Sequence, residues 1–198
     1  MNMNEQFELA EKLISGAGVQ RDEDEAVRLL TSAGHAGHVK AQALLGSMLR
    51  NCGKIDEAKT WLGKAADSGD TGAQVELGMV CVSSGGPHAD YNKAHECWKA
   101  AARAGTGMAF ANLGMLYANG LGVKRSPTKA VLLATTAVFA GNQEASTLVK
   151  DFTPLLKQSS PNAIRQMKES LSKLESLAAT GDKNTVCCWM IDNLNSLE

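Results

Sequence analysis

Two short groupings of histidine, glutamate and cysteine are the side chains of this chain best suited to chemistry. His35 and His38 are separated by two residues, and His95, Glu96 and Cys97 are consecutive. These types ligate zinc, but zinc sites use signatures such as C-x2-C or H-E-x2-H, and neither stands nearby. Adjacent residues of a helix also point in different directions. We therefore predict no metal site and interpret both groupings as structural.

Two glycine-rich segments, 16–18 and 120–122, superficially suggest phosphate-binding loops. Such loops follow a strand and open a helix, and the P-loop form needs Gly-Lys-Ser/Thr, so neither condition is met. No motif combines a nucleophile, a base and an orienting group. We predict that the chain is not an enzyme and binds no cofactor. A hydrolase that uses a thiol or a histidine, such as Cys97 or His95, is the alternative.

A small-residue frame, A-x6-A-x3-G-x3-A, recurs along the chain and indicates the elements that position all other side chains. Successive first alanines are 32, 36 and 36 residues apart, as 58−26, 94−58 and 130−94 show. A fixed period of this size marks a repeat architecture in which each unit buries its apolar face against its neighbours. The four copies are Ala26-Ala33-Gly37-Ala41, Ala58-Ala65-Gly69-Ala73, Ala94-Ala101-Gly105-Ala109 and Ala130-Ala137-Gly141-Ala145.

Close helix packing explains the residue types of the frame. Alanines seven residues apart lie on one helix stripe and allow another helix to approach closely. The glycine four residues later suits a left-handed helix end, because it has no Cβ. Asp22 and Ser126 are expected N-caps for the helices that follow them. Each repeat is thus predicted to be a helix hairpin.

The clearest copy also carries the wider pattern A-x3-LG-x2-Y-x2-G-x-GV, followed by A-x6-A-x3-G. Its matching residues are Ala109, Leu113, Gly114, Tyr117, Gly120, Gly122, Val123, Ala130, Ala137 and Gly141. This pattern resembles the Sel-one-like repeats, relatives of the tetratricopeptide repeat, and the resemblance covers about residues 5–142. A fifth copy starts at Ala145 but has Val149-Lys150 in place of Leu-Gly, so it is degenerate.

The resemblance implies an all-α, right-handed α/α superhelical solenoid whose first helices line a concave face. We place four repeats at about 5–37, 38–69, 70–105 and 106–141, followed by a degenerate repeat helix and C-terminal capping helices over 143–198. The serine and proline at 160 and 161 start an amphipathic tail helix. The tail is expected to cover the open end of the fourth repeat. Filling of the groove by the tail, or homodimerisation through the last helix, remain alternatives.

In proteins of this kind the concave face usually binds another protein, which makes a protein–protein interaction scaffold or adaptor the expected function. The alternatives are a sequestering inhibitor of a partner protein and a hydrolase-type enzyme, since the resemblance also implies the β-lactam-related activity that has been assigned to some relatives. With the repeat-opening alanine as position zero, positions −1, +2, +6, +9 and +10 should face the groove. The projected residues are Phe7, Glu11, Ile14, Lys40, Ser47, Arg50, Asn51, Val75, Met79, Val82, Met108, Met115 and Asn119.

Charge and cysteine content limit the kinds of partner and the cellular location that we expect. The net charge of −1 and a pI near 6.4 argue against a nucleic-acid surface, which is usually basic. No apolar run reaches the roughly 18 residues of a membrane span, and the start shows no secretory signal. Five cysteines without a regular disulfide spacing are expected to be buried small hydrophobes. We therefore expect a cytoplasmic protein that binds neither nucleic acid nor membrane.

Overall fold

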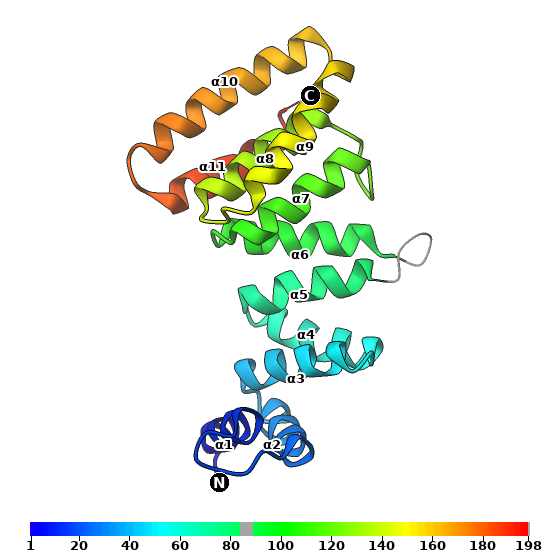
Figure 1. The fold of residues 1–198 in the computed structure, drawn as a ribbon, viewed down its shortest axis with the longest axis vertical. Helices are drawn as coiled ribbons and strands as arrows, with labels where there is room; N and C mark the ends of the chain where they lie inside the picture. The colour runs from blue at the N-terminus through cyan, green and yellow to red at the C-terminus, as the bar shows by residue number, and fades with distance from the viewer. Residues whose placement is uncertain (84–88, 198) are drawn as a thin grey trace. The chain divides into compact units, whose positions relative to one another are not determined.

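A computed structural model describes residues 1–83 and 89–197, and every regular element in those two ranges is helical (Figure 1). The all-α prediction is therefore confirmed for the described residues. The α-helices are α1 (Met3–Ser15), α2 (Glu23–His35), α3 (Val39–Asn51), α4 (Ile55–Asp67), α5 (Thr71–Val82), α6 (Tyr91–Arg103), α7 (Gly107–Asn119), α8 (Pro127–Phe139), α9 (Ala145–Phe152), α10 (Pro161–Ala178) and α11 (Lys183–Asn193), with a 3₁₀ helix η2 (Thr153–Gln158) after α9.

The frame alanines lie in the core, as predicted from their spacing. The eight alanines at the first two positions of the four copies are all fully buried, and the fourth-position alanines are at most 2% exposed. The glycine of the Leu-Gly pair lies at the helix crossing in the same way. A Cβ on Gly46 would come 2.6 Å from Leu62 Cγ and 3.1 Å from the Leu62 backbone nitrogen. Small side chains therefore set the distance between the two helices of a hairpin.

Caps define the helix ends where the sequence predicts them. The side chain of Asp22 accepts a hydrogen bond from the backbone of Glu25, and Ser126 accepts one from Lys129. Asn2 opens α1 with a capping box that it shares with Glu5. Past the end of α2, Gly37 has a φ of +90°, a left-handed conformation that favours glycine. These local signals make each hairpin readable from sequence.

The chain divides into two compact units, residues 1–84 and 85–198. The first contains the hairpins α1–α2 and α3–α4 and the helix α5. In it, each helix packs on the next one along the chain, and α3 also contacts α5. The apolar residues of the second helices close its core, where Leu30 and Leu62 are fully buried.

The second unit contains α6–α11. Helix α7 packs on α6 and α8, and α9 packs on α8 and contacts α7. The degenerate fifth copy thus still starts a helix at Ala145, although α9 has only eight residues before η2 takes over. Phe110, Leu113, Leu132 and Leu133 form the fully buried centre of this unit.

The tail folds back on the second helices of the repeats. Helix α10 begins at the predicted Ser160 cap and packs on α8, and α11 packs on both α6 and α8 (Figure 1). The buried residues that α11 supplies include Cys187, Met190 and Ile191. An ion pair of 3.2 Å between Arg103 and Asp192 joins α6 to α11. The main contacts of the tail are therefore with the second helices.

Candidate functional site

The projected binding residues lie on α1, α3 and α5 of the first unit and on α7 of the second unit, and in each unit taken by itself we call the side of these first helices that carries them the first-helix face. Its exposed members are Glu11, Lys40, Asn51, Met108, Met115 and Asn119. The half-buried members are Phe7, Ile14, Ser47, Arg50, Met79 and Val82. Val75 differs from the rest, because only 5% of it is exposed. It therefore adds almost no surface to a binding site.

A shallow hollow on the first-helix face brings together residues of two repeats, and we call it the α1–α3 hollow. It is lined by Asn4, Phe7, Glu8, Glu11, His38, Val39 and Lys40. The rings of Phe7 and His38 stack with centroids 4.6 Å apart. His38 is fixed from behind, because its Nδ1 accepts a 3.0 Å hydrogen bond from the backbone of Ala41. That bond leaves Nε2 to carry the hydrogen in the neutral ring.

A second polar group lies where α3 contacts α5. The Ser47 hydroxyl donates a 2.8 Å hydrogen bond to the Glu76 carboxylate, and Arg50 Nε lies 3.5 Å from the same oxygen. The helical offsets predicted Ser47 and Arg50 for this face but not Glu76, which lies three residues after Ala73. The available signal was a single carboxylate between Val75 and Leu77, in a helix that is otherwise largely apolar. These two contacts with Glu76 join α3 to α5 within the first unit.

Two methionines of α7 are exposed on a helix that is otherwise mostly buried. Met108 is 51% exposed and Met115 is 40% exposed, whereas Phe110 and Leu113 are completely buried. Since the two methionines are seven residues apart, they lie on one stripe of the helix. Asn119 extends this stripe and ties its side chain back to the carbonyl of Met115. The second unit therefore presents flexible apolar side chains to solvent.

The three histidines within the described residues, His35, His38 and His95, are engaged in structural contacts. His35 lies edge-on to Trp61, with ring centroids 4.9 Å apart, whereas His38 stacks on Phe7. In the second unit, His95 Nε2 lies 3.4 Å from the Tyr117 hydroxyl, and Lys129 lies over the Tyr117 ring. Burial, with a smaller contribution from Lys99, lowers the pKa of His95 below its ordinary value. Burial also raises the pKa of Tyr117 and lowers that of Lys129.

The cysteines divide into two classes. Cys81, Cys97 and Cys187 are buried, as expected for small hydrophobes, whereas Cys52 and Cys188 are exposed, so that expectation is wrong for two of the five. All five are free thiols. In the part of the chain that the structure describes, no cluster of three or more histidine, cysteine, aspartate or glutamate side chains could hold a metal ion. No described helix is long and apolar enough to cross a membrane.

The chain is similar in structure to two repeat proteins. It aligns over 99% of its length with a protective antigen of uropathogenic Escherichia coli strains that displays an SLR fold, at 24% identity and a TM-score of 0.75. Over 76% of its length it aligns with a Sel1 repeat protein from Oxalobacter formigenes, at 28% identity and a TM-score of 0.68. The chain spans 41% and 63% of the lengths of these two proteins. A comparison with curated proteins gave no match.

The repeats themselves match a family model. The model of the Sel1 repeat matches residues 6–38, 39–70, 71–106 and 109–138, which together make up more than half of the chain. These segments contain most of each hairpin from α1–α2 to α7–α8 and every buried alanine of the frame except Ala145. The chain belongs to the Sel1 repeat family.

Proposed function

We propose that the chain is a non-catalytic scaffold that binds a protein or peptide partner on its first-helix face. Sel1 repeat proteins typically serve as protein-interaction scaffolds. The observation that carries the proposal for this chain is the methionine stripe of α7, with Met108 half exposed and Met115 40% exposed. Exposed methionines gathered on one helix stripe favour an interface, and their flexible side chains adapt to a partner surface.

The first unit carries polar groups of its own on its first helices. The α1–α3 hollow offers a stacked aromatic pair beside carboxylates, and Glu76 is held between Ser47 and Arg50. Polar groups of this kind fix the register of a bound segment, whereas apolar side chains supply most of the binding free energy. We expect a partner surface that contacts α7 to be apolar, and one that contacts the first unit to be charged.

Substitution of the methionine stripe tests the proposal. We expect Met108→Glu combined with Met115→Glu to abolish capture of a partner from the native source, while far-ultraviolet circular dichroism stays unchanged. The matched control is Val19→Glu combined with Leu121→Glu, which places the same charges on exposed residues of two loops. The partner identified by mass spectrometry is then titrated against all three purified proteins. Equal affinity of the methionine variant and the wild type would contradict the proposal.

The surroundings of Cys97 and His95 favour a scaffold over the hydrolase alternative. Cys97 is buried, and the ring of His95 faces the hydroxyl of Tyr117 on the neighbouring helix. If the chain is a scaffold, Cys97→Ser and His95→Ala should change its stability and leave partner binding intact.

The cysteines bear on the location of the protein. Free thiols are in keeping with a reducing compartment, and we propose a cytoplasmic location on that ground. A homodimer through the last helix would be seen as a doubled mass in sedimentation.

A further inference from the structure

We propose that His38 is a pH-sensitive switch at the junction of the first two hairpins. In its neutral form the ring caps α3, because Nδ1 accepts a 3.0 Å hydrogen bond from the backbone N–H of Ala41. An imidazolium ring donates from both nitrogens and has no acceptor left. Protonation of His38 therefore replaces this hydrogen bond with two opposed N–H groups, and the ring must turn away from Ala41.

The histidine at this cap makes the junction respond to pH. The other described helices with a side-chain N-cap use an oxygen of asparagine, aspartate or serine. At the same place of the next repeat, Asp70 accepts a 2.7 Å hydrogen bond from the backbone of Ala73. Carboxylates ordinarily keep their charge down to about pH 4, whereas an imidazole ordinarily titrates between about pH 5 and 8. Of these caps, that of α3 is the one that changes in mildly acidic solution.

Loss of this cap is costly because the freed donor lies in the core. Ala41 is fully buried, so water cannot readily take the place of the ring. The positive end of the α3 dipole also disfavours a charge on the ring that caps it. The same ring stacks on Phe7 of α1, with centroids 4.6 Å apart, and a turn of the ring removes this fixed support. The first turn of α3 and its contact with α1 should therefore loosen together.

The backbone of the junction stays in place when the ring moves. The N–H of His38 donates to the carbonyl of Ala33 at 3.0 Å, and the carbonyl of His38 accepts from the N–H of Gln42 at 3.1 Å. The Gln42 side chain also donates to the carbonyl of Gly34. These bonds do not involve the ring, so protonation leaves them intact. We therefore expect a local change at α1 and at the start of α3, without unfolding of the hairpins.

Charged groups around the ring act in opposite directions. Glu8 and Glu11 of α1 line the α1–α3 hollow and favour a charged ring, whereas Lys40 of α3 opposes it. All three side chains are exposed, so each effect is small. His35, at the end of α2, packs edge-on against Trp61. The geometry of the cap therefore decides which form of the ring fits the folded junction.

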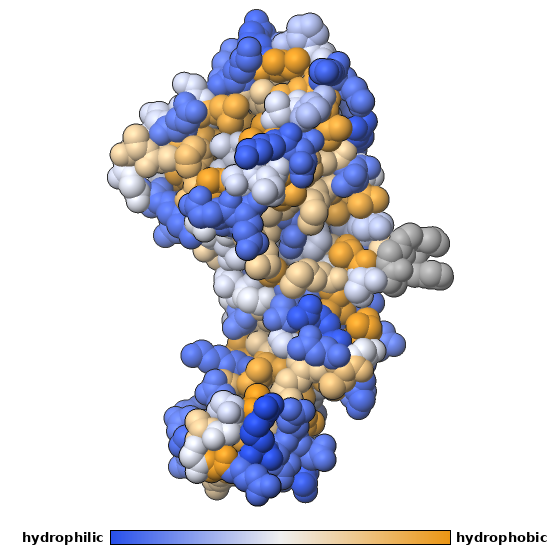
Figure 2. All heavy atoms as spheres, in the orientation of Figure 1, coloured by the Kyte–Doolittle hydropathy of each residue, from blue (hydrophilic) through white to orange (hydrophobic). Residues whose placement is uncertain are grey.

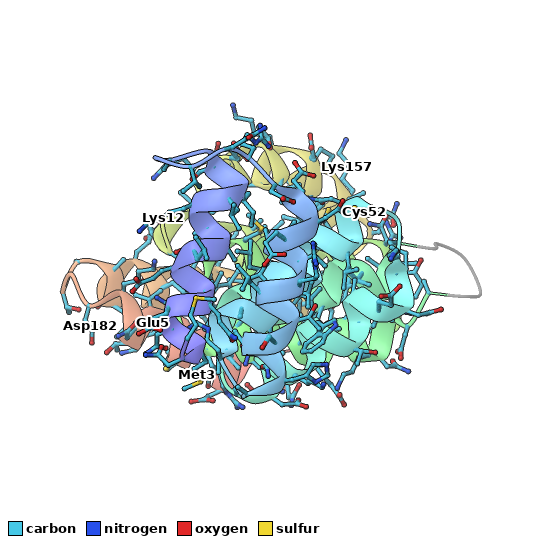
Figure 3. All side chains as sticks on the ribbon, turned by 90° about the horizontal axis from the view of Figure 1, so that it is seen from below. Met3, Glu5, Lys12, Cys52, Lys157 and Asp182 are labelled. Atoms are coloured by element: carbon cyan, nitrogen blue, oxygen red, sulfur yellow. The ribbon has the colours of Figure 1, made fainter. Side chains whose placement is uncertain are left out.

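The ring can exchange protons with solvent without any opening of the fold. His38 is half-buried, and the shallow α1–α3 hollow that it lines is open to water. Hydrophilic residues gather over the α1–α2 hairpin on the face shown in Figure 2. Figure 3 looks onto α1 from the N-terminal end, with Glu5 and Lys12 labelled on that helix. The switch therefore follows the pH of the surrounding solution.

An NMR titration of the full chain from pH 7.5 to 5 tests the proposal. The ring carbon–proton resonances report protonation of His38, and the amide of Ala41 reports the cap. We expect the Ala41 amide to shift upfield together with protonation of the ring. Its exchange with solvent, corrected for the intrinsic pH dependence, should rise at least about fivefold, as expected for loss of an N-cap. The amide of Ala73, which Asp70 caps, is the internal control and should not change.

Two variants separate the switch from other effects of acid. His38→Asp, which copies the Asp70 cap, should keep Ala41 protected and abolish its pH response. His35→Gln removes the neighbouring titratable ring and should leave that response as it is in the wild type, and circular dichroism checks the fold of both proteins. The inference is overturned by a His38 ring that stays neutral down to pH 5 or by an Ala41 amide that does not respond to protonation of the ring. An equal response in His38→Asp, or loss of the response in His35→Gln, would also overturn it.

Discussion

The side-chain amide of Gln42 donates a 2.8 Å hydrogen bond from Nε2 to the carbonyl oxygen of Gly34, in the last turn of the preceding helix. Gln74 makes the same connection to Ala66, at 3.3 Å and over the same sequence separation. Both glutamines directly follow the alanine that opens a first helix. The end of α2 is thus tied to the start of α3, and the end of α4 to the start of α5. This bond fixes the junction between consecutive hairpins in the first unit.

Removal of this bond should weaken the first unit. We expect Gln42→Ala to lower the free energy of unfolding by about 1 kcal/mol, the usual net value of one intramolecular hydrogen bond. Gln74→Ala should cost less, because its bond is longer and Gln74 is only half-buried. Urea denaturation gives the two free energies, and amide hydrogen exchange of α2 and α3 locates the effect. An equal or larger loss for Gln74→Ala would contradict this ranking.

A methyl group at the crossing of α3 and α4 should be costly. In Gly46→Ala the added Cβ meets Leu62 at 2.6 Å, including a 3.1 Å approach to its backbone nitrogen, so the two helices must move apart. Overpacking of this kind costs about 1–3 kcal/mol. The matched control is Gly63→Ala on α4, where the new Cβ has no neighbour within 4 Å. Because alanine favours helix, Gly63→Ala should raise stability by about 0.5–1 kcal/mol. Thermal and urea unfolding of both variants provide the measurement.

His95 should make stability depend on pH. Its pKa is lowered in the folded protein, first by burial and then by Lys99, with Glu96 acting in the opposite direction. The unfolded chain then binds a proton more readily, so the free energy of unfolding falls as the pH drops below about 6.5. The loss continues down to the folded-state pKa and adds nothing below it. His95→Gln should remove this contribution, as urea unfolding between pH 7.5 and 5 would show. An unchanged slope in the variant would contradict the assignment.

Thiol labelling should separate the cysteines by exposure. Cys52 and Cys188 are exposed and should react rapidly with a disulfide reagent in the native protein, whereas Cys81, Cys97 and Cys187 should react only after unfolding. Cys52 is labelled in Figure 3. Burial also raises the pKa of Cys187, which lowers its thiolate fraction. Cys52→Ser combined with Cys188→Ser should leave no fast phase. A remaining fast phase would show that a buried thiol is reached through local opening.

Much of the repeat architecture could be predicted because its signals are local. The spacing of Ala26, Ala33 and Gly37 fixes a helix stripe and a helix end, and both depend only on nearby residues. Glu76 could not be assigned in the same way, because its role comes from Ser47 and Arg50, one repeat away. Val75 was placed on the groove by its offset, yet it is buried. A helical offset gives a direction, but not what lies in that direction.

The placement of the tail was beyond sequence reasoning for a related reason. The spacing of the apolar residues in α10 and α11 predicts an apolar face on each helix, and Met167, Leu174 and Met190 are buried. An apolar helix face of this kind could pack on several different surfaces of the stacked hairpins. Only the three-dimensional arrangement shows that α6 and α8 receive α11. The candidate site could be predicted only in part. The repeat period indicates which residues to consider, but it does not indicate what they bind.

Helix α11 spans two successive second helices, and this has a consequence for how the second unit melts. In a stack of hairpins that touch only their immediate neighbours, terminal hairpins can fray one at a time. A helix that contacts both α6 and α8, and that is joined to α6 by Arg103 and Asp192, acts as a clasp over two hairpins. Fraying of either hairpin must first release this clasp. The second unit should therefore melt in one cooperative step, while the first unit, which has no such clasp among its described helices, unzips more gradually.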